Sequence, residues 1–136
     1  MKAWTLLFLA LALPAGAFAE EGGKEANANK VTYYSFNPPF VGNYALDGSP
    51  RLHVYKADIA VKITGAEAEA AVKHHEPLIR NQLVQLFTQQ TAEAMSTMEG
   101  KEKLRQEALK QTQQVLNDEE GKPIVEDLLF NNLIVQ

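Results

Sequence analysis

The segment from Arg51 to Thr64 constrains the fold more than any other part of the sequence. Apolar side chains recur at every second position along most of it, at Tyr55, Ala57, Ile59, Val61 and Ile63. Such alternation is typical of a β-strand with one buried and one solvated face. We therefore predict a long strand in an antiparallel sheet that is covered on one side only.

Shorter strands are predicted before and after this segment. Residues 31–36 are β-branched and aromatic, and a second extended piece follows Pro38-Pro39 at residues 40–46. The closing segment, residues 123–136, carries large apolar side chains at both odd and even positions. A strand with that pattern is usually internal to a sheet, or it leaves a buried face for another subunit.

Helices are predicted between the long strand and the closing segment. Residues 66–75 are rich in alanine and glutamate, and Pro77 favours a kink or a new helix start. Apolar side chains continue at helical spacing to Met98, Gly100 is expected to end this helix, and a second helix covers about residues 101–117. The predicted fold class is α+β, a small antiparallel-biased β-sheet with a two-helix insertion packed on one face.

Residues 1–19 have the features of a secretory signal in the usual order. Lys2 precedes a run of mostly leucine and alanine, Pro14 ends the run, and Ala17 and Ala19 form a small-x-small site before Glu20. The apolar run is short for a membrane span, and an uncleaved anchor is the alternative. Lys2 stays at the cytoplasmic end in either case, so the domain is expected outside the inner membrane, in the periplasm.

The rest of the chain is expected to form one domain. Residues 20–30 contain no apolar side chain larger than alanine and predict a flexible tether. Removal of residues 1–19 leaves 117 of the 136 residues, enough for a single domain at 31–136. The formal net charge then changes from −4 to −5, because only Lys2 is lost, and this sign argues against nucleic acid as a partner.

Candidate chemistry is scarce. The chain has no cysteine, which excludes disulfides and thiol chemistry. His74 and His75 are adjacent, so on a helix they diverge and do not share a metal, and the expected arrangement is a solvent-facing pair. No serine lies in a nucleophile motif. We predict no catalytic residue, no metal site and no cofactor.

Several short motifs in order resemble the flagellar basal-body-associated FliL family. They are Pro39-Phe40-Val41-Gly42-Asn43-Tyr44, Arg51-Leu52-His53-Val54, Pro77-Leu78-Ile79-Arg80-Asn81, residues 100–107 (GKEKLRQE) and the closing strand with Leu129-Phe130 and Val135-Gln136. Tyr44 replaces the family's usual aliphatic residue, and the Arg51 motif has one residue fewer. The resemblance covers roughly residues 34–136.

The resemblance implies a stomatin-like fold and a non-enzymatic role beside the flagellar motor. Partners implied in this way are stator or motor proteins and further copies of the chain in a ring, close to the membrane. The candidate interaction residues are Arg80, Asn81, Phe130 and Gln136. Arg80 also has a local interpretation, an ion pair with Glu76 or Glu107.

Two other functions are weighed against the motor role. The first is a soluble periplasmic adaptor or chaperone-like module unrelated to the motor, which the same fold and composition allow. The second is a small hydrolase, which the missing nucleophile motifs disfavour. Relative to the anchored proteins of the family, the short apolar segment at residues 1–19 implies a released form if it is cleaved.

Overall fold

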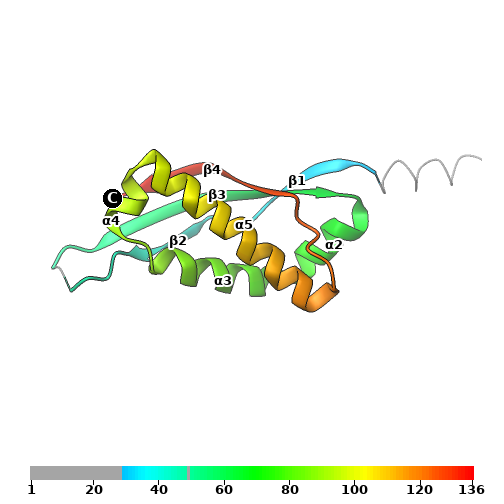
Figure 1. Ribbon diagram of the computed structural model, residues 1–136, viewed down its shortest axis with the longest axis horizontal. Coiled ribbons are helices and arrows are strands. Elements are labelled where there is room, and N and C mark those ends of the chain that lie inside the picture. The colour runs from blue at the N-terminus through cyan, green and yellow to red at the C-terminus, as the bar shows by residue number, and fades with distance from the viewer. Residues whose placement is uncertain (1–28, 49) are drawn as a thin grey trace, which may run out of the picture.

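The strand predicted from the alternating pattern forms the centre of the sheet. The computed structural model describes residues 29–48 and 50–136, and within them β3 (His53–Thr64) pairs antiparallel with the three other strands. The elements follow one another as β1 (Val31–Ser35), β2 (Phe40–Tyr44), β3, α2 (Ala66–His74), α3 (Glu76–Thr88), α4 (Ala92–Ser96), α5 (Met98–Glu120) and β4 (Asp127–Val135) (Figure 1).

β1 and β2 lie end to end along one edge of β3. Val31 pairs with Thr64 at one end of that edge, and Tyr44 pairs with His53 at the other. β4 pairs along the opposite edge, so the sheet is three strands wide. The open antiparallel sheet with helices confirms the predicted α+β class.

The helices cover one face of the sheet (Figure 1). The predicted apolar side of β3 is buried against them, at Tyr55, Ala57, Ile59, Val61 and Ile63. The helices contribute buried side chains of their own, among them Ile79, Leu83, Phe87, Met95, Leu104, Ala108 and Leu116. This burial is the main source of stability in a domain of this size, since apolar area removed from water stabilises the fold by about 25 cal/mol per Å².

The closing strand is an edge strand, not an internal one. β4 has a register shift opposite Asp58 and Ile59, so Asn131 is an extra residue between Phe130 and Asn132. Before this bulge the even-numbered Leu128 and Phe130 share the helix-covered face, and after it the odd-numbered Leu133 and Val135 do, because each pairs with an odd-numbered residue of β3. The bulge therefore explains most of the large apolar side chains at both odd and even positions of β4.

The helical insertion contains four helices where two were predicted. Pro77 lies in the first turn of α3, which confirms the predicted restart. α3 ends at Thr88, however, and the hydroxyl of Thr91 then accepts a hydrogen bond from the Ala94 amide at 3.0 Å and starts α4. This capping residue begins a new helix although the apolar spacing continues through it.

Gly100 does not end a helix. It lies in the first turn of α5, where its amide donates to the hydroxyl of Thr97 at 3.0 Å. A Cβ atom at this position would lie 2.2 Å from the carbonyl oxygen of Ala94, so close approach of α4 and α5 is what requires glycine. Met98 was expected among the apolar helix positions, but its side chain is 90% exposed. α5 ends at Glu120, before Gly121 at φ 78°.

Candidate functional site

Arg80 connects the N-terminal part of α3 with β2 and with the chain between β1 and β2. Its Nε donates to Oε1 of Glu76 at 3.3 Å, as the local interpretation predicted, and one Nη donates to the carbonyl oxygen of Pro38. Its guanidinium also stacks over the Phe40 ring. The hydroxyl of Tyr34 donates to the second oxygen of Glu76 at 2.8 Å, and burial together with that carboxylate raises the pKa of Tyr34.

Of the other three candidate interaction residues, Asn81 follows Arg80 on α3, whereas Phe130 and Gln136 lie at β4 and at the residue after it. Asn81 is exposed on α3. Phe130 is half-buried on β4 and packs toward the core, with its ring 6.1 Å from that of Phe87. Gln136 continues the ladder beyond β4, since its amide donates to the carbonyl of Val54 at 2.8 Å. The four residues thus do not form one site, and Ala17, Ala19 and Glu20 lie outside the described residues.

A second arginine fixes α5 to β4. Arg105 donates to both carboxylate oxygens of Glu102, at 2.6 and 2.9 Å, and also to Asp127 at 2.8 Å and to the carbonyl of Leu128 at 3.1 Å. These hydrogen bonds raise the pKa of Arg105 and lower that of Glu102. No local pattern in the sequence connects Arg105 with Asp127.

The two adjacent histidines differ in their surroundings. His74 is exposed, but His75 is buried, and its Nε2 lies 2.7 Å from Oε1 of Glu120. The prediction of a solvent-facing pair is therefore wrong for His75. The reason is the Pro77 restart: His75 lies between the end of α2 and the start of α3, and that junction packs against α5.

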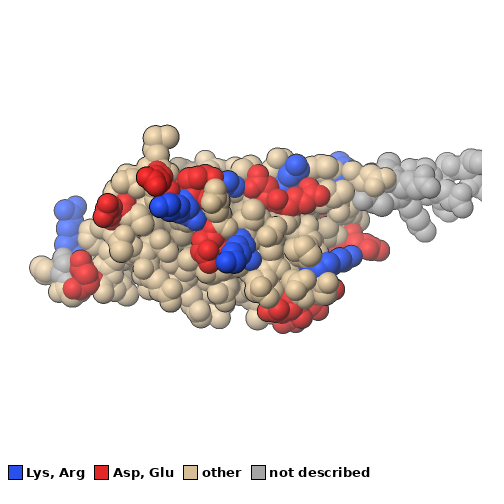
Figure 2. Space-filling view, in the orientation of Figure 1, with Lys and Arg blue, Asp and Glu red and all other residues tan. Residues whose placement is uncertain are grey.

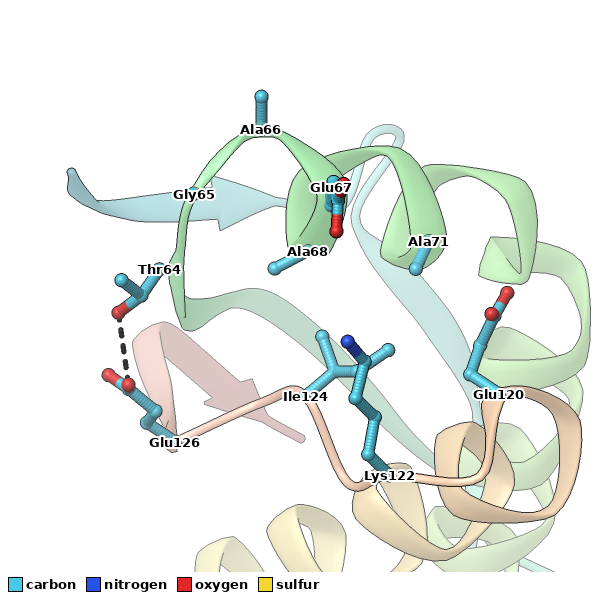
Figure 3. Close-up of a pocket in the computed structure, with 10 residues that line it drawn as sticks. All are labelled: Thr64, Gly65, Ala66, Glu67, Ala68, Ala71, Glu120, Lys122, Ile124 and Glu126. Atoms are coloured by element: carbon cyan, nitrogen blue, oxygen red, sulfur yellow. Dashed lines mark hydrogen bonds between the residues drawn. The ribbon is translucent and has the colours of Figure 1, made fainter. Parts of the chain in front are cut away.

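A hollow lies where α2 begins and α5 ends. Its volume is about 680 Å³, and Figure 3 shows its apolar side chains and its charged ones together. Glu120 is held by His75, and Glu126 accepts a hydrogen bond from Thr64 at 2.9 Å. The lining residues are Thr64, Gly65, Ala66, Glu67, Ala68, Ala71, Glu120, Lys122, Ile124 and Glu126.

Charged side chains of both signs are mixed over the helical side of the domain (Figure 2). Acidic ones gather where α5 ends, in agreement with its final residues Asp118, Glu119 and Glu120. Across residues 29–48 and 50–136 the histidines and carboxylates form no group of three that could hold a metal. In those same ranges, no helix has the length and apolar character needed to cross a membrane.

These features define a class of protein: an α+β domain with one helix-covered and one open sheet face, whose arginines and buried histidine link separate elements. The sequence model of the family "Flagellar basal body-associated protein FliL" matches residues 33–136. The chain is also similar to a flagellar protein FliL of Aquifex aeolicus (strain VF5), at 30% identity over 104 residues. The chain belongs to the FliL family, which confirms the resemblance. The alignment spans 76% of this chain and 60% of the relative's length.

Proposed function

We propose that the protein is a non-enzymatic accessory of the flagellar basal body that supports the motor's stator through protein–protein contacts. The observation that carries the proposal is the family match, which extends over residues 33–136 and so over nearly all of the described domain. The name of the aligned relative, a flagellar protein, supports the same assignment.

The proposed location is the periplasm, at the inner membrane beside the basal body. Residues 1–19 supply the export signal, with cleavage between Ala19 and Glu20. Sequencing of the mature N-terminus tests this step: a start at Glu20 means a released domain, and an intact Met1 means an anchored one. Self-association into a ring is part of the proposed role, since a ring of copies can surround or support a motor unit.

The function is tested by an in-frame deletion of the gene, complemented with the full chain. The expected result is reduced swimming or swarming that worsens as the viscosity of the medium rises, while electron microscopy still shows assembled filaments. Restoration by the full chain excludes effects on neighbouring genes. Normal motility of the deletion strain at every viscosity would overturn the proposal.

A co-purification experiment separates the motor role from the adaptor alternative. The tagged full chain, crosslinked in cells before extraction, is expected to bring down stator or basal-body proteins. Recovery of a periplasmic protein outside the flagellum, with no motor component, would favour the adaptor or chaperone-like module instead.

A further inference from the structure

Side chains of α2 and of the chain after α5 face one another across the hollow described above. We call this hollow, lined by residues 64–68, 71, 120, 122, 124 and 126, the α2–α5 hollow. Figure 3 shows Ala68 and Ala71 on the side of α2 and Ile124 on the opposite side. The volume of about 680 Å³ lies within the range of pockets that hold a ligand, about 300–1,000 Å³. The α2–α5 hollow can thus take a few side chains of a partner.

The apolar walls of the α2–α5 hollow belong to the core of the domain. Ala68 and Ile124 pack against the buried core cluster, so their positions are fixed by the fold. Both residues, and Ala71 beside them, are only partly buried. Because two of these three side chains are alanines, they leave room for an apolar side chain that enters from outside.

The charged part of the lining is acidic. It consists of three glutamates and one lysine, with a formal net charge of −2: Glu67, Glu120, Glu126 and Lys122. One carboxylate oxygen of Glu120 is held by His75, and one of Glu126 is held by Thr64, so both carboxylates have defined positions. In the described part of the chain, the side chains of Glu67 and Lys122 make no hydrogen bond or ion pair. The α2–α5 hollow therefore has charge to offer to a basic group.

The end of α5 adds to this preference for positive charge. The C-terminal end of a helix carries a partial negative charge, which basic side chains in the last turn usually offset. The last turn of α5 contains no basic residue, and Asp118, Glu119 and Glu120 lie there instead. The positive end of α2, by contrast, is already offset by Glu67 and Glu69 in its first turn. A cation in the α2–α5 hollow is thus favoured by the end of α5 as well as by the glutamates.

The N-terminal segment of the chain itself has the same sign of charge as the hollow. The Gly65 amide donates to the carbonyl of Lys30 at 2.9 Å, so the chain enters the domain at the rim of the α2–α5 hollow. Residues 20–28 contain three glutamates and one lysine, and their net charge is −2. Like charges oppose association, so the occupant is expected to come from another molecule.

From this arrangement we propose that the α2–α5 hollow binds an extended segment of a partner protein in which lysine or arginine stands beside small apolar residues. The basic group lies against Glu67 and Glu120, and the apolar side chains contact Ala71 and Ile124. The inference rests on the proposed function in one respect, namely that the occupant is a protein. It adds the chemistry of the partner and the surface that receives it.

Fluorescence anisotropy of short labelled peptides measures this binding, with the purified full chain in mild detergent. A peptide in which lysine and alanine alternate is expected to bind, and to bind less tightly as the salt concentration rises, because salt screens exposed charges. A lysine–serine peptide is expected to bind more weakly, since it lacks the apolar contacts. A glutamate–alanine peptide and a peptide copy of residues 20–28 are expected not to bind.

Charge variants locate the binding on the protein. Glu67→Lys is expected to weaken binding of the lysine–alanine peptide at least about threefold. Glu93→Lys is the matched control with the same net charge, since Glu93 is also exposed and lies in the first turn of α4. Lys122→Glu is expected to strengthen binding about threefold, and Lys110→Glu, at an exposed position of α5, is its control. A misfolded variant would not gain affinity.

The proposal is overturned if the lysine–alanine peptide does not bind, or if the copy of residues 20–28 binds as tightly. It is overturned as well if the variants in the hollow and their controls have equal effects. These measurements use purified components, so failure of binding leaves the motility test of the flagellar role unaffected. Conversely, normal motility of the deletion strain would refute the flagellar role and leave the measured binding in place.

Discussion

The guanidinium carbon of Arg80 lies 4.5 Å from the centre of the Phe40 ring. Since the same guanidinium donates to Glu76 and to the carbonyl of Pro38, one side chain connects α3, β2 and the chain between β1 and β2. The resemblance to the family marked this arginine as a candidate for contact with another protein. In the structure it donates two hydrogen bonds within the domain.

Replacement of Arg80 by alanine is therefore expected to destabilise the fold. We expect Arg80→Ala to lower the free energy of unfolding by about 1–3 kcal/mol, through the lost charged hydrogen bonds and cation–π contact. Urea unfolding followed by circular dichroism measures this. The neighbouring Asn81 is exposed, and Asn81→Ala is expected to change stability by no more than about 0.5 kcal/mol. Equal effects of the two substitutions would contradict the structural role of Arg80.

For Gly100→Ala we predict a change in stability opposite in sign to the one that helix propensity predicts. Gly→Ala inside a helix usually stabilises it by about 1 kcal/mol. Here the new methyl group would lie 2.2 Å from the Ala94 carbonyl oxygen, so we expect Gly100→Ala to destabilise the protein by about 1–3 kcal/mol. Lys110→Ala, at an exposed position of α5, is the control. Thermal unfolding that shows Gly100→Ala to be the more stable protein would refute the close approach of α4 and α5.

The ion pair of Glu102 with Arg105 predicts a specific loss of stability in acid. Hydrogen bonds from Arg105 lower the pKa of Glu102 from its ordinary 4.5. A carboxyl group whose pKa is lower in the folded state stabilises the fold fully above the unfolded pKa, and this contribution disappears as the pH falls through the folded pKa. The difference in unfolding free energy between the wild type and Glu102→Gln should thus be constant near neutrality and shrink below about pH 4.5. A difference that stays unchanged down to pH 3 would be inconsistent with this pairing.

His75 and His74 provide a comparison between adjacent residues of the same type. His75 contacts Glu120 across the α2–α3 junction, whereas His74 is exposed. We expect His75→Ala to lower the free energy of unfolding by about 1–2 kcal/mol, and His74→Ala by less than about 0.5 kcal/mol. Hydrogen exchange should show faster opening at the end of α5 in the first variant only. If the two variants behave alike, the contact with Glu120 does not hold α5 in place.

Local patterns were sufficient to predict the long strand and the restart at Pro77. Five of the six buried residues of β3 are the ones that alternation selects, because a strand covered on one face needs that pattern, and Ala60 is the exception. Pro77 likewise acts through its own ring and missing amide proton. In such cases the physical cause lies within a few residues of the effect.

Features that depend on packing between distant segments could not be predicted in the same way. Gly100 resembles a helix breaker until the carbonyl of Ala94 is placed beside it. The bulge at Asn131 exchanges the buried parity of β4, and only the register with β3 reveals it. His75 and Arg105 are ordinary surface residues by sequence, and their partners lie 45 and 22 positions away.

The end-to-end placement of β1 and β2 beside β3 has a mechanical consequence. The chain enters the domain where Val31 pairs with Thr64, and its last residue, Gln136, pairs with Val54 near the other end of β3. Tension between these two ends would be directed along the strands. The five residue pairs between β1 and β3 would then be loaded in shear, all at once, and would not open one after another. A domain with this layout resists being pulled apart along its length better than across it.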